Sequence, residues 1–244
     1  MKKVGFIFFI TLFVSSLSHA QKIYAWWDAG VRVGYGLTGF LNSNILDDSK
    51  YDYKLKTGYS LGGKFGMFFG LYNGFTIEAN IASYNQAFDY SRNNTQLLHE
   101  INWKSLDLAL LYRNQRNGVY VELGPMLSLI NKVEQDDPTA PEKTDVKEFY
   151  EKNYISGVFG VGGYILNYEN FTTMLGIRLG YGFTDMVNAK GRAANYPNPS
   201  SVSQPYASEK STNAAFVQLN LEFNFALGYY GKSSCSKRAS MFKM

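Results

Sequence analysis

Hydrophobic side chains alternate with small or polar ones in eight separate runs of the chain. In a β-strand, successive side chains point to opposite faces, so a period of two marks a strand with one apolar and one polar face. Leu61 and Phe65, for example, share a face opposite Gly62 and Lys64. The pattern predicts eight strands, at residues 24–36, 57–70, 75–84, 101–112, 119–130, 154–166, 171–183 and 217–225.

The fourth run changes phase along its length. Ile101 and Trp103 fall on the opposite face from Leu106 and Leu108 if the alternation is unbroken. One extra residue in a strand, a β-bulge, shifts the phase by one position. We therefore predict a β-bulge near Lys104.

The connections between the runs alternate in length. Turn-sized segments lie at 71–74, 114–118 and 167–170, whereas long polar segments lie at 37–56, 87–96, 131–153 and 186–211. Short turns at one end and long loops at the other are typical of a small outer-membrane barrel, whose short turns face the periplasm. The sequence predicts an all-β fold: an eight-stranded antiparallel transmembrane β-barrel in the outer membrane, with long loops outside the cell and both ends of the mature chain in the periplasm.

The distribution of charge separates this prediction from a soluble barrel of the lipocalin type, which also has eight alternating strands. Here the large apolar face carries almost no charge, and the opposite face carries glycines and isolated charges. A mean hydropathy of -0.21 is compatible with a membrane barrel, because the polar faces offset the lipid-facing ones. Aromatic residues gather near the strand ends, and Trp26, Tyr112 and Trp103 are predicted to lie in girdles at the membrane surfaces.

The first 20 residues have the pattern of a secretory signal peptide. Lys2 and Lys3 precede an apolar run at 4–14, and Ser18 and Ala20 stand where a signal peptidase reads small side chains. An apolar run of this length is too short to cross a bilayer as a helix. We expect a cleaved signal peptide at 1–20, the barrel at 21–230 and a basic periplasmic tail at 231–244.

The predicted tail carries basic residues and no acidic ones. We expect a flexible arm whose cations could dock on an acidic partner or on lipid head groups. The candidate docking residues are Lys232, Lys237, Arg238 and Lys243.

Isolated charged residues fall on the predicted inner face of the barrel. They are Asp28, Arg32, Lys64, Glu78, Asp107, Glu122, Arg178 and Glu222. Unpaired charges are costly inside a narrow lumen, so we expect these residues to form a network of ion pairs. Eight strands leave an interior only wide enough for side chains, which favours a plug over a conduction path. A proton or ion relay through the same residues is the alternative.

Candidate catalytic and cofactor chemistry is sparse. Two histidines and one cysteine are too few for an all-protein zinc site or an internal disulfide. Without Lys2 and Lys3, 22 of the 24 basic residues remain against 20 acidic ones, which gives nucleic-acid binding no support from charge. His99 is a candidate general base near the loop rim, yet Ile101 stands where lipid A 3-O-deacylase barrels of the His-x-Ser type have serine. We expect no cofactor, no metal and no enzyme activity, with a rim-site enzyme as a minority alternative.

The cleavage site at Ala20-Gln21, the eight strands and the long outer loops resemble the outer-membrane β-barrel family widespread in Bacteroidota. Length, basic character and loop plan are most similar to the PorT branch of that family. The resemblance implies an accessory, non-enzymatic component of type IX protein secretion, which exports and matures cargo with a C-terminal signal. It also implies membrane lipid and other secretion-system proteins as partners. The alternative is a structural or adhesive barrel of the OmpA type that presents surface loops.

Overall fold

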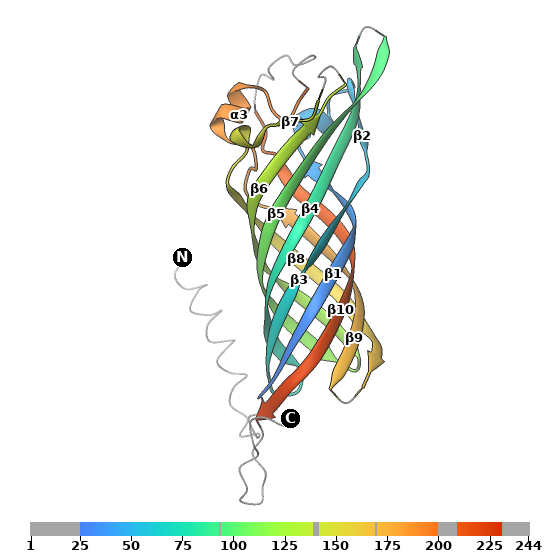
Figure 1. Ribbon diagram of the computed structural model, residues 1–244, viewed down its shortest axis with the longest axis vertical. Helices are drawn as coiled ribbons and strands as arrows, with labels where there is room; N and C mark the ends of the chain where they lie inside the picture. The colour runs from blue at the N-terminus through green and yellow to red at the C-terminus, as the bar shows by residue number, and fades with distance from the viewer. Residues whose placement is uncertain (1–24, 93, 139–141, 169, 200–208, 231–244) are drawn as a thin grey trace, which may run out of the picture.

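Eight long strands close into one antiparallel ring (Figure 1). The computed structural model describes residues 25–92, 94–138, 142–168, 170–199 and 209–230. Each ring strand pairs with the next, and the last pairs back with the first. The order is β1 (Ala25–Leu41), β3 (Lys56–Phe69), β4 (Asn73–Arg92), β5 (Thr95–Arg116), β6 (Val119–Asp136), β8 (Asn153–Asn167), β9 (Phe171–Gly182) and β10 (Asn213–Tyr230). The predicted eight-stranded antiparallel barrel is confirmed.

The two ends of the barrel differ in their connections. At one end, which we call the turn end, β1 begins, β10 ends and short turns join the other strands (Figure 1). The turn between β5 and β6 is Asn117-Gly118, with φ of 53° and 79°. Positive φ at both positions is the requirement of a type I′ hairpin, and Asn-Gly is the pair that meets it at least cost.

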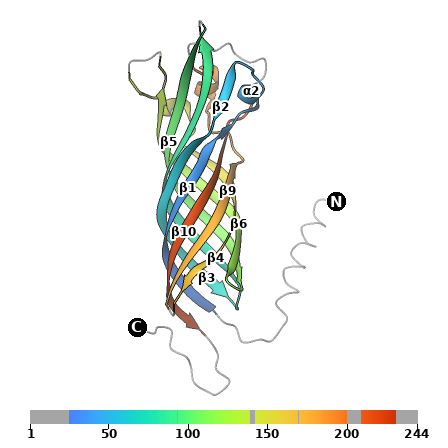
Figure 2. The same ribbon diagram turned by 90° about the vertical axis from the view of Figure 1, so that its right-hand side faces the viewer.

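The opposite end, which we call the loop end, carries short additional elements (Figures 1 and 2). They are α2 (Ser43–Leu46), β2 (Tyr51–Lys54), β7 (Thr144–Asp145), the 3-10 helix η1 (Lys147–Phe149) and α3 (Ala189–Ala193). Strand β2, in the connection from β1 to β3, pairs with β4, and β7, in the connection from β6 to β8, pairs with β6. Both connections therefore fold onto strands of the ring. Among the described residues, no helix has the length and apolar character needed to cross a membrane.

The outer surface of the ring is apolar and its interior holds charge. Ile77 and Leu219 are 61% and 58% exposed, whereas the inward-facing Glu78 and Arg178 are each 1% exposed. This distribution is the reverse of that in a soluble protein, and it matches a barrel whose outer face contacts lipid. The fold is therefore a transmembrane β-barrel of the outer-membrane type.

Two predictions about the strands are wrong. The predicted β-bulge near Lys104 is not in β5: Lys104 pairs with Lys132 and Ser105 with Ile130, so the extra residue is Asn131 on β6, and β5 keeps one inward phase through Ile101 and Asp107. The predicted loop at 87–96 is wrong, because β4 continues to Arg92 and β5 begins at Thr95. Apolar and polar residues alternate along a strand only where its outer face contacts lipid; we call that part of the outer surface the apolar belt. The hairpin of β4 and β5 extends beyond the apolar belt, so its outer face is no longer apolar.

The interior of the loop-end half is packed with apolar side chains. Trp103 is fully buried there, so its predicted place in an outer aromatic girdle is wrong; it shares the unbroken inward phase of β5 with Ile101 and Asp107. Tyr84 stacks between the rings of Trp103 and Phe216, with centroid distances of 5.4 and 5.8 Å. We call this cluster the loop-end core; its members include Phe40, Tyr84, Phe88, Ile101, Trp103, Val133 and Phe216.

Candidate functional site

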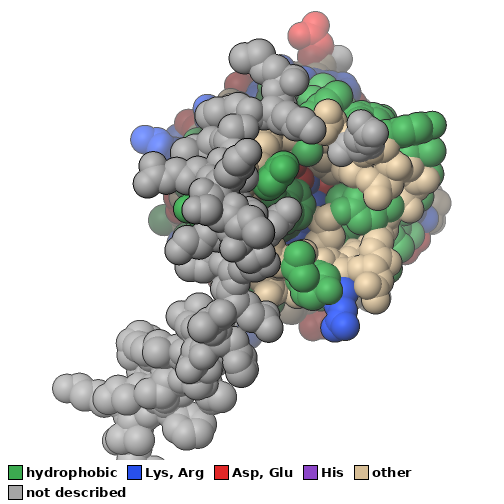
Figure 3. Space-filling view, turned by 90° about the horizontal axis from the view of Figure 1, so that it is seen from below, with side chains coloured by type: hydrophobic (Ala, Val, Ile, Leu, Met, Phe, Trp, Pro, Cys, Tyr) green, Lys and Arg blue, Asp and Glu red, His purple; other side chains and the backbone are tan. Residues whose placement is uncertain are grey.

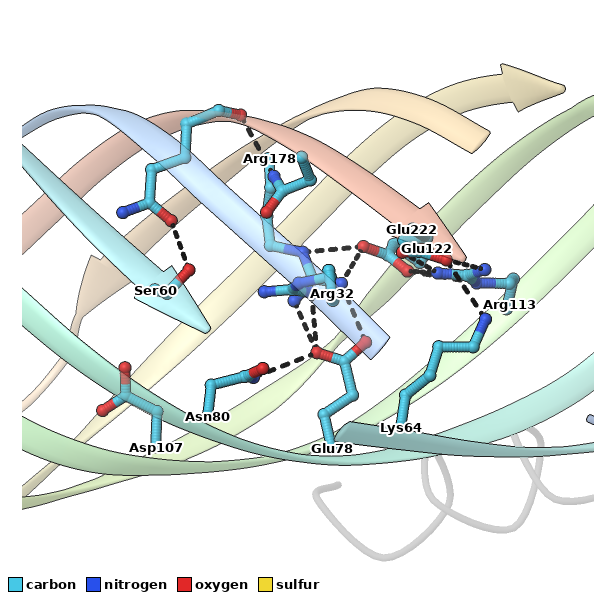
Figure 4. A network of polar contacts seen from close by, with 12 residues as sticks. Arg32, Ser60, Lys64, Glu78, Asn80, Asp107, Arg113, Glu122, Arg178 and Glu222 are labelled. Carbon is cyan, nitrogen blue, oxygen red and sulfur yellow. Dashed lines mark hydrogen bonds and ion pairs between the residues drawn. The ribbon is translucent and has the colours of Figure 1, made fainter. Parts of the chain in front are cut away.

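The turn-end half of the lumen holds eight buried charged side chains in one continuous set of ion pairs, most of which Figure 4 labels. Each is at most 5% exposed, and together they come from every ring strand except β8. Four are cations and four are anions, so their formal charges sum to zero. We call this set the lumen network; it consists of Asp28, Arg32, Lys64, Glu78, Arg113, Glu122, Arg178 and Glu222.

The first half of the lumen network is centred on Arg178. Its Nη1 lies 2.7 Å from Oε2 of Glu78, and its Nε donates to Oε1 of Glu122 at 2.7 Å. Arg32 donates from Nη1 to the same Oε2 of Glu78 at 2.6 Å. Each carboxylate therefore receives more than one charge-assisted hydrogen bond, the strongest class of hydrogen bond in proteins.

The second half is centred on Arg113. Its Nη2 donates to Oε2 of Glu122 at 2.6 Å and to Oε1 of Glu222 at 2.7 Å. Lys64 continues the series, with Nζ 3.1 Å from Glu222 and 3.7 Å from Asp28. The order along the network is thus a strict alternation of cation and anion from Arg32 to Asp28.

Two of these ion pairs join opposite walls of the barrel. Arg178 on β9 reaches Glu78 on β4, and Arg113 on β5 reaches Glu222 on β10. In a ring of eight, each of these strand pairs is four places apart, so each bridge spans the lumen (Figure 4). Viewed from the turn end, hydrophobic side chains surround a central hollow with charged side chains inside it (Figure 3). The network therefore obstructs the lumen.

Glycines make room for the network. A Cβ on Gly160 of β8 would lie 2.5 Å from Oε1 of Glu122, and a Cβ on Gly66 of β3 would overlap Oδ1 of Asp28. Strand β8 supplies no charge, but its glycines leave the space that the side chains of its neighbours fill. Small residues at these inward positions are therefore part of the site.

Seven of the eight charged residues predicted to face the lumen lie in the network. The exception is Asp107, whose carboxylate accepts hydrogen bonds from Ser105, at 2.7 Å, and from the Tyr84 hydroxyl. Arg113 was missed because the predicted fourth strand ended one residue earlier. The alternation offered a signal: Leu110 and Tyr112 face lipid, so Arg113 must face inward on the same strand.

The network also brings three carboxylates together. Ligand atoms of Glu78, Glu122 and Glu222 lie within 4.8 Å of one another. Each of these carboxylates already contacts two cationic side chains, so an added metal ion would face Arg113 and Arg178 at close range. The donor set does not fit a metal centre, and its chemistry is that of an internal salt-bridge plug.

His99 lies on β5 beyond the apolar belt, buried in the loop-end half and not on an open rim. Its Nδ1 is 3.2 Å from Oδ2 of Asp137, and the Tyr90 hydroxyl donates to Oδ1 of Asp137 at 3.0 Å. Burial lowers the pKa of His99, and the Asp137 carboxylate opposes that shift. The His99 ring is fully buried and therefore does not face solvent, where a substrate would approach. Through Asp137, which follows β6, it links β6 with Tyr90 on β4.

Two sets of predicted residues lie outside the described part of the chain. They are the predicted signal peptide at 1–20 and the tail cations Lys232, Lys237, Arg238 and Lys243.

The sequence matches no protein-family model and no curated protein. Among solved structures, the fold is similar to Neisserial surface protein A, with 11% identity, a TM-score of 0.42 and coverage of 82% of this chain and 97% of that one. It is also similar to Ail of Yersinia pestis, with 14% identity, a TM-score of 0.40 and coverage of 82% and 99%. OprG of Pseudomonas aeruginosa gives 11% identity, a TM-score of 0.38 and coverage of 85% and 97%. These values assign neither a family nor an activity.

Proposed function

We propose that this chain is a closed outer-membrane barrel that acts by contact with other proteins and not by conduction through its lumen. The observation that carries the proposal is the pair of ion-pair bridges, from Arg178 to Glu78 and from Arg113 to Glu222, that join opposite walls of the barrel. Eight strands leave room only for side chains, and here those side chains are held by partners on facing strands. Function must then lie on the outer surface or at the two ends.

We propose further that the loop end faces the cell exterior and the turn end faces the periplasm. The asymmetry of the connections supports this orientation, because short turns face the periplasm in barrels of this type. Lys147 and Lys190 are exposed at the loop end. A cysteine placed at either position, with Cys235 replaced by serine, should react with a membrane-impermeant maleimide on intact cells. Protection on intact cells together with reaction after lysis would reverse the orientation.

Within this frame, we propose an accessory role in type IX protein secretion, alongside other secretion-system proteins. The family resemblance of the sequence supports this role, and the obstructed lumen fits an accessory and not the export conduit. Contacts would fall on the loop end, the lipid-facing surface or the basic tail with Lys232, Lys237, Arg238 and Lys243.

A clean deletion tests this role. Cells without the gene should accumulate unprocessed cargo with its C-terminal signal in the periplasm, as measured by mass spectrometry of periplasmic and secreted fractions. The intact gene should restore export. A gene in which the four tail cations are changed to glutamine should also restore export, unless the tail is the docking site. Normal export in the deletion strain would contradict the secretion role.

A structural or adhesive barrel is the second candidate, and the folded loop end favours it. Elements α2, β2, η1 and α3 give this end a defined surface, with Asn42 and Asn188 capping the two α-helices. Normal export combined with loss of surface attachment in the deletion strain would support this candidate.

A further inference from the structure

A gap interrupts pairing in the barrel wall near the loop end. The last residue pair between β1 and β3 is Thr38 with Lys56, although β1 continues to Leu41. The side chain of Gln86, on β4, takes the place of the missing strand partner, because its Oε1 accepts a hydrogen bond from the backbone N–H of Phe40 at 3.2 Å. Beside it, the Thr38 hydroxyl exchanges hydrogen bonds with the backbone of Asn85.

An apolar hollow of about 340 Å³ lies at this gap. It is lined by residues 37–41 of β1, by Ala215 and its neighbours on β10, and by Leu55 from the link between β2 and β3. Gly180 also lines it, and the absence of a side chain there leaves room for the Phe216 ring, with which a Cβ would overlap. The volume falls within the usual range for sites that hold small ligands.

The hollow is continuous with the lipid-facing surface. Leu37, Leu179 and Val217 line it and are 41%, 44% and 45% exposed on the outer face of the barrel. Leu55 projects beside the hollow and is 81% exposed, with no part of the described chain covering it. Apolar hollows of this kind do not hold water well. Acyl chains of the surrounding bilayer are the apolar groups that reach this position directly.

We propose that this hollow binds one acyl chain of a membrane lipid, in the leaflet nearest the loop end. The apolar side chains of Leu37, Leu55 and Val217 line the hollow, and Lys54 lines it as well. An acyl chain is already in apolar surroundings in the bilayer, so its gain here comes from close packing against these side chains and not from leaving water. The site thus selects a lipid by its chain, and it is separate from the lumen network.

Native mass spectrometry of the folded full-length mature chain tests the proposal. The protein would be held in detergent and titrated with palmitoyl-oleoyl-phosphatidylethanolamine. We expect one lipid to bind more tightly than the rest. Ala215→Phe fills the hollow, so the first lipid should then bind no more tightly than the rest.

Ala79→Phe is the matched control, because Ala79 is also an outward-facing alanine but lies on β4 away from the gap. It should leave the first binding step unchanged. Leu55→Ser provides a second variant that does not depend on filling the hollow; since Leu55 is largely exposed, folding should be unaffected and lipid binding should fall several-fold.

A lipid with a photoreactive group in its acyl chain would then locate the site. Cross-links should concentrate on peptides that contain residues 53–55 and 215–217, and Ala215→Phe should remove them. Equal lipid binding by the parent, Ala215→Phe and Ala79→Phe would overturn the proposal. A protein dimer that Ala215→Phe abolishes would assign the hollow to a second copy of the chain, and would overturn it too.

Discussion

The two halves of the barrel interior are filled by different chemistries. The turn-end half holds the lumen network, in which alternating cations and anions satisfy one another across the lumen. The loop-end half holds the loop-end core, where aromatic rings such as those of Tyr84 and Trp103 stack inside the strands. Both fill a space only as wide as the side chains. They differ in how strongly each depends on the identity of single residues.

The difference follows from position relative to the membrane. Where lipid surrounds the strands, the outer face of the barrel is apolar. The charged side chains of the lumen network lie inside the ring and pair with one another there. Beyond the lipid, the outer face of β4 and β5 is polar: Asn102 and Lys104 lie there, while Ile101 and Trp103 turn inward. On the β4 and β5 side, the loop-end half is thus built like a soluble domain, whereas Leu37, Leu179 and Val217 keep the outer face of β1, β9 and β10 apolar. A buried ion pair fails when one partner is lost, whereas an apolar core tolerates changes that conserve volume.

Arg178→Ala is expected to have the largest effect. It leaves the carboxylates of Glu78 and Glu122 without their shared guanidinium, which should cost about 3–5 kcal/mol of unfolding free energy. Urea unfolding of the barrel in lipid vesicles measures the loss, and the heat-resistant band on a gel should disappear at a lower temperature. Arg178→Lys should restore only part of the stability, because an ammonium group cannot bind two carboxylates in the geometry of a guanidinium.

The double variant Arg178→Met with Glu122→Gln sharpens this test. It removes one cation and the adjacent anion, so Arg32 keeps Glu78 and Arg113 keeps Glu222. We expect it to be more stable than Arg178→Ala, because buried pairs replaced by neutral residues of similar volume are often tolerated. A double variant no more stable than Arg178→Ala would show that packing, and not charge balance, accounts for the loss.

Trp103→Ala should have the next largest effect, about 3 kcal/mol, from the cavity that it leaves in the loop-end core. The Trp103 ring packs against Tyr84 and against Phe40, at centroid distances of 5.4 and 6.3 Å. Because the network lies elsewhere in the lumen, we expect faster proteolysis of the loop end while the membrane-embedded strands stay folded. Loss of the whole barrel in one step would contradict the division into two halves.

Much of this fold was predictable because lipid imposes a simple rule on the outer face. Leu61 and Phe65 alternate with Gly62 and Lys64, and that period alone located a strand and turned Lys64 inward. The same rule could not give the partners of Lys64, since these depend on the stagger of strands around the ring. It also failed where lipid ends: β4 continues to Arg92 without an apolar outer face. Trp103 keeps the inward phase of β5, where it packs on Phe40 and Tyr84, although a large apolar side chain was expected to face outward.

Acidification should weaken the loop-end half selectively, with an effect smaller than that of either substitution above. Burial lowers the pKa of His99 in the folded protein, so the unfolded chain takes up a proton first as the pH falls below about 6.5. Unfolding free energy of this region therefore decreases as the pH falls from that value to the folded pKa. The groups around His99 are Phe88, Tyr90, Asp136, Asp137 and the backbone of Pro197.

Hydrogen exchange of the amides in β4 and β5 near His99 measures this pH dependence. Exchange should accelerate on acidification in the parent, and the amides of strand segments around the lumen network should change less. In His99→Gln the side chain has no proton to gain, so the acceleration over the same pH range should be largely lost. An unchanged pH profile in that variant would contradict the assignment of the effect to His99.

Ile101→Leu should have the smallest effect, below about 1.5 kcal/mol, because it conserves volume in an apolar environment. Ile101 is 1% exposed within the loop-end core, so it is as buried as Arg178 in the network. Arg178→Lys is the corresponding conservative change there, and we expect it to cost more when both are measured by urea unfolding in the same vesicles. If the two changes cost the same, residue identity would matter equally in both halves, and the contrast between them would rest on composition alone.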